Sequence, residues 1–171
     1  SKAKNYKIWD LDGKIFKDFS FMGVGTNILG YSNLEVNNYV LSKLKNGNVS
    51  TLNAIEDITL SEKLINLHPW SQKVKLCRTG AEAAAIALRI SRVYNKKNKV
   101  LVCGYHGWQD WYLAANLKNK NNLNEHLING IGAEGVLKDL KNSILSFSYN
   151  DFNTLKSLVL SNKDISAIVM E

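Results

Sequence analysis

The chain of 171 residues has few of the features that mark a secreted or membrane protein. It carries only two cysteines, Cys77 and Cys103, and no C-x-x-C pair, so it cannot form the disulfide framework of a small secreted domain. No apolar run approaches the roughly 18 residues of a membrane-spanning helix, and no signal peptide is visible. We therefore expect a cytoplasmic protein with no membrane partner.

Arginine is also scarce, which argues against a nucleic-acid-binding protein. The net charge is +7, from 22 basic and 15 acidic residues, but 19 of the basic residues are lysines and only three are arginines. Proteins that read DNA bases favour arginine for the base edges, and no helix expected here carries a basic stripe. We expect a solvated surface and no nucleic-acid partner. The alternative, a basic nucleic-acid-binding domain, rests on the net charge alone.

The first part of the chain predicts a hairpin and two helices. Asp12-Gly13 lies between two apolar-rich runs, residues 6–10 and 14–19, and Asp-Gly in this setting is a strong hairpin signal. Two helices are expected to follow, over residues 34–45, with Asn33 as the N-cap, and over residues 53–67.

The pattern changes near residue 70, where strands begin to alternate with helices. We expect strands over residues 73–77, 99–103, 143–148 and 165–170, and helices over 81–94 and 151–160, the second capped by Asn150 or Asp151. Residues 116–135 are polar and predict a surface loop. The alternation predicts an α/β fold with a mostly parallel sheet and flanking helices. We expect an N-terminal segment over 1–70 and the first part of a larger domain over 71–171.

The strongest local motif is the sequence RTGAEAAA at residues 78–85, at a predicted strand-to-helix junction. Thr79 and Glu82 have the spacing of a capping box, and the small residues beside them let the backbone approach another molecule. Free amide groups and the helix dipole at such a start favour an anion such as phosphate. A well-capped helix that binds nothing explains this local pattern equally well.

The second motif is GYHGWQDW at residues 104–111, directly after the strand expected over 99–103. A flat ring could stack on Tyr105 or Trp108, and His106 could act as an acid, a base or a hydrogen-bond donor. A loop that buries its own aromatic side chains is the alternative. Because three aromatic residues, a histidine and an aspartate gather at the carboxyl end of one strand, we favour a binding site here.

Other motifs do not support a site. Residues 130–135 match G-x-G-x-x-G, but a polar loop precedes them instead of the first strand of a βαβ unit, so we expect a flexible loop entering a short helix. His68, His106 and His126 lack the spacing of metal ligands, so no metal site is expected. Cys77 and Cys103 each end an expected apolar strand, where a thiol acts as a small hydrophobic group.

Taken in order, these segments resemble the amino-terminal part of the class III pyridoxal-phosphate-dependent aminotransferases, and most closely the glutamate-1-semialdehyde aminomutase-like branch. WDLDGK at residues 9–14 is similar to the opening hairpin of the family, and RTGAEA at 78–83 is similar to its phosphate loop NSGTEA. The sequence YHG at 105–107 matches the family's YHG, and YND at 149–151 matches a motif of the aminomutase branch. IVME at 168–171 resembles the family's VIVE.

This resemblance implies a fold-type I transferase and pyridoxal 5'-phosphate as cofactor. It implies that Thr79, Gly80 and Ala81 hold the cofactor phosphate. Tyr105 would stack on the pyridine ring, His106 and Gly107 would line the same wall, and Glu171 would lie near the cofactor floor. The implied partners are a small-molecule amino donor, a carbonyl acceptor and, in the full-length protein, a second copy in a homodimer.

The chain also departs from the family pattern. Ala81 replaces the usual Thr or Ser, which removes one hydroxyl contact to the phosphate. Val24 stands where the aminomutase branch tends to carry Trp, so that branch's substrate is not carried over. The resemblance puts the lysine that binds the cofactor covalently beyond residue 171, so no catalytic residue is assigned and we expect the isolated chain to be inactive. The alternative is a non-enzymatic α/β module that binds phosphate or a nucleotide.

Overall fold

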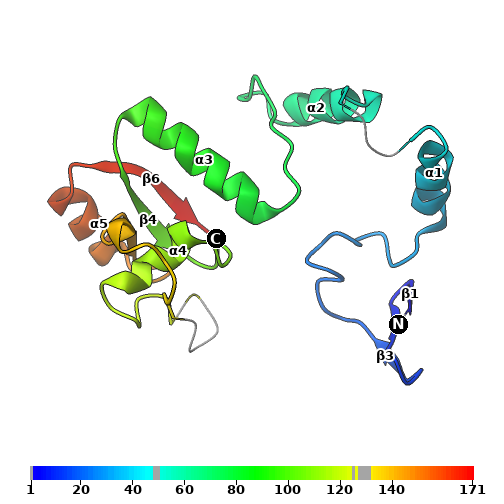
Figure 1. The fold of residues 1–171 in the computed structure, drawn as a ribbon, viewed down its shortest axis with the longest axis horizontal. Helices are drawn as coiled ribbons and strands as arrows, with labels where there is room; N and C mark the ends of the chain where they lie inside the picture. Colours follow the sequence, from blue (N-terminus) through cyan, green and yellow to red (C-terminus); the bar gives the residue numbers. More distant parts are fainter. Residues whose placement is uncertain (1, 48–50, 125, 127–131) are drawn as a thin grey trace. The chain divides into compact units, whose positions relative to one another are not determined.

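The computed structural model describes residues 2–47, 51–124, 126 and 132–171 of the chain. These residues form two compact units, Ser1–Leu60 and Ser61–Glu171, which are described separately below. Figure 1 shows the strands and helices of both units along the chain. Of the residues of the G-x-G-x-x-G match, Gly130 and Ile131 lie outside the described residues, and the 3₁₀ helix η2 (Lys138–Leu140) follows this match.

The N-terminal unit begins with a small antiparallel sheet in the order β1-β2-β3. Its strands are β1 (Lys2–Lys4), β2 (Lys7–Trp9) and β3 (Ile15–Lys17). The carboxylate of Asp10 accepts hydrogen bonds from the amides of Asp12 and Lys14, and Gly13 has a φ of 81°, which glycine tolerates. The predicted hairpin is therefore confirmed, while β1 was not predicted from the sequence.

Two helices follow in the same part of the chain, α1 (Leu34–Leu44) and α2 (Ile55–Leu67). The side chain of Asn33 accepts a hydrogen bond from the amide of Val36, so Asn33 is the predicted N-cap. Glu56 links the two helices, because it lies 2.7 Å from the ammonium of Lys43 and accepts a 2.8 Å hydrogen bond from the Tyr39 hydroxyl.

The second unit contains a parallel sheet in the order β5-β4-β6. The central strand β4 (Lys99–Cys103) lies between β5 (Ile144–Ser146) and β6 (Ile165–Met170). The helices α3 (Gly80–Asn95) and α5 (Phe152–Ser161) complete the α/β fold, which confirms the predicted class. Asp151, not Asn150, is the N-cap of α5, since its carboxylate accepts from the amide of Thr154.

Alternate residues of β4 face two different layers of the core. Val100 and Val102 pack in one cluster with Leu88 of α3. Leu101 and Cys103 pack in the other, against partly buried leucines of α5. None of these four residues has exposed surface. The strand β4 is therefore buried on both faces, as the central strand of a parallel sheet should be. Burial also raises the pKa of the Cys103 thiol.

Two expectations about the second unit are wrong. Residues 73–77 form no strand, because an apolar/polar alternation does not by itself supply a neighbouring backbone for pairing. The polar segment 116–135 is not all surface, since Asn116 and Leu123 are buried. The Asn116 side-chain oxygen accepts from the amide of Leu123, which turns this segment back into the core. Its first residues lie in the 3₁₀ helix η1 (Ala114–Leu117), which directly follows the short helix α4 (Asp110–Leu113).

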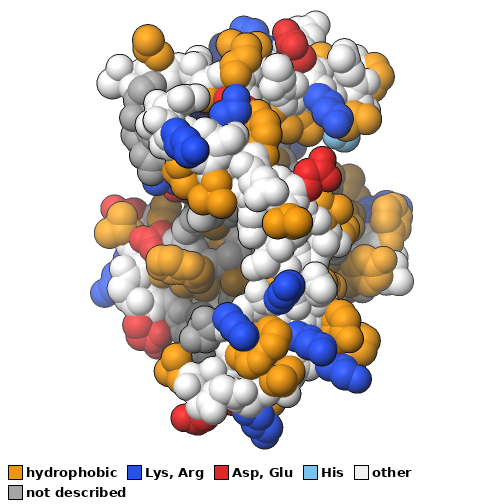
Figure 2. All heavy atoms as spheres, turned by 90° about the vertical axis from the view of Figure 1, so that its right-hand side faces the viewer, with side chains coloured by type: hydrophobic (Ala, Val, Ile, Leu, Met, Phe, Trp, Pro, Cys, Tyr) orange, Lys and Arg blue, Asp and Glu red, His pale blue; other side chains and the backbone are white. Residues whose placement is uncertain are grey.

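The N-terminal unit has no core of its own, because no described residue in 2–47 or 51–60 is buried. Large apolar side chains are exposed instead, among them Leu11 and Phe19, each 90% exposed. On the face drawn in Figure 2, hydrophobic side chains are interspersed with Lys and Arg side chains. Within the described residues, no helix has the length and hydropathy needed to cross a membrane.

Candidate active site

The first turn of α3 forms one side of the candidate site. Thr79 has an extended backbone, and its hydroxyl accepts a 3.2 Å hydrogen bond from the amide of Glu82. The Thr79 carbonyl accepts from the amide of Ala83. Gly80 and Ala81 occupy the first helical positions, whose amides a helix leaves without partners inside itself. This end of α3 therefore presents backbone N–H groups and the positive end of the helix dipole.

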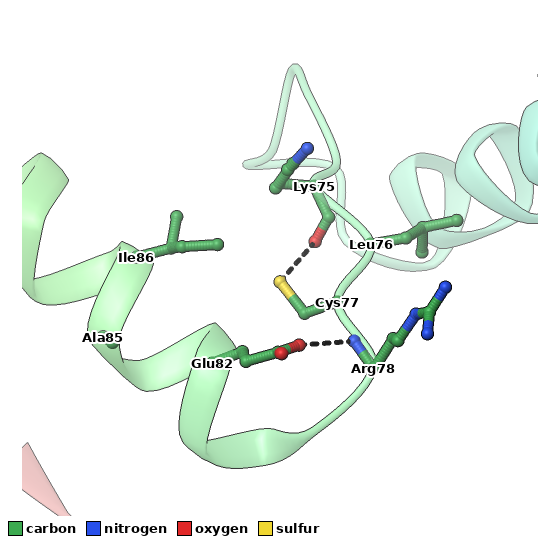
Figure 3. Close-up of a pocket in the computed structure, with 7 residues that line it drawn as sticks. All are labelled: Lys75, Leu76, Cys77, Arg78, Glu82, Ala85 and Ile86. Carbon is green, nitrogen blue, oxygen red and sulfur yellow. Dashed lines mark hydrogen bonds between the residues drawn. The ribbon is translucent and has the colours of Figure 1, made fainter. Parts of the chain in front are cut away.

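The predicted capping box is only half formed. Thr79 caps the helix as expected, but the Glu82 carboxylate accepts from the amide of Arg78, at 3.0 Å, instead of from the amide of Thr79. Figure 3 shows this bond on the side of α3 that also carries Ala85 and Ile86. The Glu82 carboxylate is thus tied to the segment before the helix.

The loop between β4 and α4 forms the other side of the site. It contains two glycines with positive φ, Gly104 at 88° and Gly107 at 96°. The backbone amide of Tyr105 donates to the Glu171 carboxylate at 3.2 Å. His106 donates from Nε2 to the carbonyl oxygen of Cys103 at 2.8 Å, because a carbonyl can only accept. The proton on Nε2 leaves Nδ1 as the nitrogen at which a neutral His106 could accept.

Tyr112 of α4 lies beneath this loop and was not expected as a site residue. Its hydroxyl donates to the carbonyl of Gly104 at 2.7 Å, and its ring has no exposed surface. Burial raises the pKa of the Tyr112 phenol, so the hydroxyl keeps its proton and remains a donor. In the sequence, a tyrosine inside an apolar run is typical of a core residue, so only the folded chain identifies this contact.

The helix start and the loop line one pocket with a volume of about 410 Å³. The two sides lie close together at Gly107, where an added Cβ would lie 3.3 Å from the Cβ of Ala81. Small residues therefore allow the loop to approach the helix start. The seven lining residues are Gly80, Ala81 and Ala84 of α3, and Tyr105, His106, Gly107 and Trp108 of the loop.

Four of the six residues expected to bind the cofactor line this pocket: Gly80, Ala81, Tyr105 and His106. The other two act behind it. Thr79 caps the helix that contributes Gly80 and Ala81, and Glu171 bonds to the backbone of Tyr105. Figure 1 shows the C-terminus at the carboxyl end of β6, next to the end of β4.

A second pocket, of about 540 Å³, lies against other residues of α3, which include Glu82 and Ile86 (Figure 3). It is also lined by Cys77, which is partly exposed and so is not the buried strand residue that the sequence predicted. The Cys77 sulfur lies 3.8 Å from the carbonyl oxygen of Lys75. Among the described residues, no group of three His, Cys, Asp or Glu side chains could hold a metal ion.

Comparison with known families gives one match that covers the whole chain. The model of the family described as "Aminotransferase class-III" matches residues 1–171. This family uses pyridoxal phosphate, and one solved structure with the same fold is described as a transaminase with PLP bound; it has a TM-score of 0.83 at 19% identity and covers 100% of this chain and 39% of that one.

Curated relatives include aminotransferases and aminomutases. A 3-aminobutyryl-CoA aminotransferase of Cloacimonas acidaminovorans is 33% identical over 163 residues, which cover 95% of this chain and 35% of that protein. A glutamate-1-semialdehyde 2,1-aminomutase of Nitrosopumilus maritimus is 31% identical over 174 residues, which cover 99% of this chain and 39% of that protein. The chain thus spans little more than a third of the length of these relatives.

A solved structure supports the fold. An omega-transaminase from Sphaerobacter thermophilus superposes with a TM-score of 0.83 at 20% identity, over 100% of this chain and 40% of that one. At this identity the likeness establishes the fold alone, and it agrees with the fold-type I architecture that the sequence indicated.

Proposed function

Because this chain belongs to the class III aminotransferase family, we propose that it forms the cofactor-phosphate half of a pyridoxal-phosphate-dependent transferase. The complete protein would move an amino group between a small-molecule amino donor and a carbonyl acceptor. The observation that carries this proposal is the pocket in which the capped start of α3 meets the Tyr105–His106 loop.

The phosphate is proposed to bind at the start of α3. The backbone amides of Gly80 and Ala81 are free of intrahelical partners by position, and the helix dipole favours an anion there. Ala81 has no hydroxyl to add, so the backbone would supply the hydrogen bonds at this position. Thr79 fixes the helix start through its bond to Glu82 and thereby sets the direction of these amides.

The pyridine ring is proposed to pack against the loop. The side chain of Tyr105 is 51% exposed and lines the pocket, so its ring can cover a flat aromatic ligand. His106 shares this wall, with Nε2 committed to the carbonyl of Cys103. Glu171 would lie near the cofactor floor, where its carboxylate orients the backbone of Tyr105.

When bound, the cofactor supplies the electron sink that amino-group transfer needs. None of the seven described residues that line the pocket is a lysine, the residue type that holds this cofactor covalently. We therefore propose that this chain binds the cofactor without covalent attachment and does not transfer amino groups by itself.

Three ligands test the two halves of the site separately: pyridoxamine 5'-phosphate, pyridoxamine and inorganic phosphate. Calorimetric titration of the chain should give the tightest binding for pyridoxamine 5'-phosphate, which alone fills both halves. Tyr105→Ala should weaken the two ligands that carry a ring, while Thr79→Ala should weaken the two that carry phosphate. Binding of pyridoxamine 5'-phosphate that is no tighter than that of inorganic phosphate would contradict the proposal and favour a simple phosphate-binding module.

The proposal includes a homodimer of the complete protein. The exposed apolar side chains of the N-terminal unit, such as Leu11 and Phe19, support it, because surfaces of this kind are usually covered in an assembly. Sedimentation of the complete protein should give the mass of two chains, and a monomer at micromolar concentration would contradict this part of the proposal.

A further inference from the structure

The peptide bond between Gly104 and Tyr105 is held from both sides. Its carbonyl oxygen accepts the 2.7 Å hydrogen bond from the Tyr112 hydroxyl, and its N–H donates the 3.2 Å hydrogen bond to the Glu171 carboxylate. Because a peptide unit is planar, two partners on its opposite polar atoms fix the orientation of the whole plane. This plane sets the direction in which the chain enters Tyr105.

The ring of Tyr112 also supports the side chains that follow this peptide. Its centroid lies 6.3 Å from that of Tyr105 and 5.6 Å from that of His106, and the interplanar angles are 84° and 89°. Edge-to-face packing of this kind is favourable for aromatic pairs. Tyr112 thus contacts both aromatic residues of the pocket wall from the buried side, although it does not line the pocket.

We propose that Tyr112 is a positioning residue of the cofactor site, which holds the Gly104–Tyr105 peptide and the rings of Tyr105 and His106 in their binding geometry. This inference rests on the proposed function of the pocket and extends it to a residue that would not contact the ligand. Without the bond from Tyr112, the partly buried Gly104 carbonyl would lose this partner, and the peptide plane would be free to turn.

The hydroxyl is the group that separates this role from that of an ordinary core residue. Tyr112→Phe keeps the buried ring and its volume, so a residue that only fills the core would tolerate the change. If Tyr112 is a positioning residue, the same change should loosen the loop around Tyr105 and weaken the binding of a ligand that carries a ring. The matched control is Tyr94→Phe, the same change at an 86% exposed tyrosine of α3.

Amide hydrogen exchange tests the proposal without any ligand. In Tyr112→Phe, the amide of Tyr105 should exchange about tenfold faster, as expected when the peptide loses one partly buried hydrogen bond. The amides of Val100–Val102 in β4 should keep their rates, and Tyr94→Phe should change neither set. Equal acceleration of loop and strand amides, or an unchanged Tyr105 amide, would overturn the proposal.

Ligand binding adds a second, independent measurement. Tyr112→Phe should weaken pyridoxamine 5'-phosphate about tenfold and leave the affinity for inorganic phosphate within about twofold, since the start of α3 is untouched. Equal weakening of both ligands would overturn the positioning role. If the unchanged chain bound inorganic phosphate but not pyridoxamine 5'-phosphate, the proposed function would fail, while hydrogen exchange would still decide the role of Tyr112.

A second variant reaches the same peptide from its other side. Glu171→Ala removes the acceptor for the Tyr105 amide without altering the buried ring of Tyr112. In this variant the Tyr105 amide should also exchange faster. In the double variant, this amide should exchange little faster than in the more affected of the two single variants, because both hydrogen bonds hold one peptide plane. Fully additive effects would mean that the two side chains act separately and would contradict the proposed mechanism.

Discussion

Gly104 and Glu171 lie so close together that no side chain fits between them. A Cβ built at Gly104 would lie 2.8 Å from the Cβ of Glu171 and 3.3 Å from its backbone nitrogen. The Glu171 amide donates to the carbonyl of Cys103, which holds the ends of β4 and β6 side by side. The glycine is therefore required for this approach as well as for its positive φ.

Gly104→Ala should destabilise the chain and disturb the loop. Strain at the positive φ costs about 1–3 kcal/mol, and the clash with Glu171 adds to it. Gly135→Ala is the control, because Gly135 has a φ of 86° but no atom within 4 Å of the added Cβ. Urea denaturation should show a larger loss of free energy for Gly104→Ala, and equal losses for the two variants would contradict the close contact.

Thr79→Ala should lower the free energy of unfolding by about 1 kcal/mol, because the start of α3 loses its cap. Thr79→Ser keeps a hydroxyl that can accept from the amide of Glu82, so it should retain most of this stability. Urea denaturation followed by circular dichroism measures both variants. If the two were equally destabilised, the methyl group of Thr79, and not its hydroxyl, would be the important feature.

The hydroxyl of Ser91 joins α3 to β6. It lies 2.9 Å from the carbonyl oxygen of Ser166 and 2.8 Å from the Ser166 hydroxyl, which belongs to a buried residue. Ser91→Ala should cost about 1 kcal/mol in the free energy of unfolding, since buried polar groups lose a partner. Ser161→Ala, at an exposed position of α5, should cost less because alanine favours a helix. The reverse order in denaturation experiments would contradict this network.

Glu56 should titrate far below its usual range. Its hydrogen bonds with Lys43 and then Tyr39 lower the pKa of this carboxyl from 4.5 to about 2. Since the folded pKa lies below the unfolded one, the contribution of this carboxylate to stability is complete above about pH 4.5 and is lost as the pH falls towards 2. Carboxyl NMR titration measures this pKa.

The control for Glu56 uses two neighbouring lysines of the same segment. Lys43→Met should raise the pKa of Glu56 towards its ordinary value, while Lys45→Met should leave it nearly unchanged, because the ion pair is formed by Lys43. High salt should also raise the pKa of Glu56, since salt screens the attraction between the charges of an exposed ion pair. Equal effects of the two lysine changes would show that general charge, and not this contact, lowers the pKa.

Local signals predicted several elements of the fold correctly. Asp12-Gly13 predicted the hairpin, and the apolar runs predicted β4 and β6 with the bounds that the structure has. These features depend on the turn preference of a few residues or on a run long enough to be buried. Residues 73–77 carried a similar alternation but form no strand, because pairing depends on a neighbour that the pattern does not specify.

The candidate site was predictable to the same extent. The motifs around Gly80 and Tyr105 indicated a phosphate site and a ring site, and in the structure residues of both motifs line one pocket. Tyr112 could not be found in this way, because the apolar run around it indicates an ordinary core residue, and no local pattern predicts its bond to Gly104. The burial of Asn116 and Leu123 in a polar segment was also missed, because no local pattern predicts the bond between them.

Three features follow from local sequence alone, because each depends on residues that are neighbours in the chain: the start of α3 at Thr79, the hairpin at Gly13 and the buried character of β4. The contacts by which Glu171 and Tyr112 hold one peptide of the Tyr105 loop are set by the folding of the whole unit. These residues come from separate elements, and the hydrogen bonds between them exist only after the sheet and α4 have packed together.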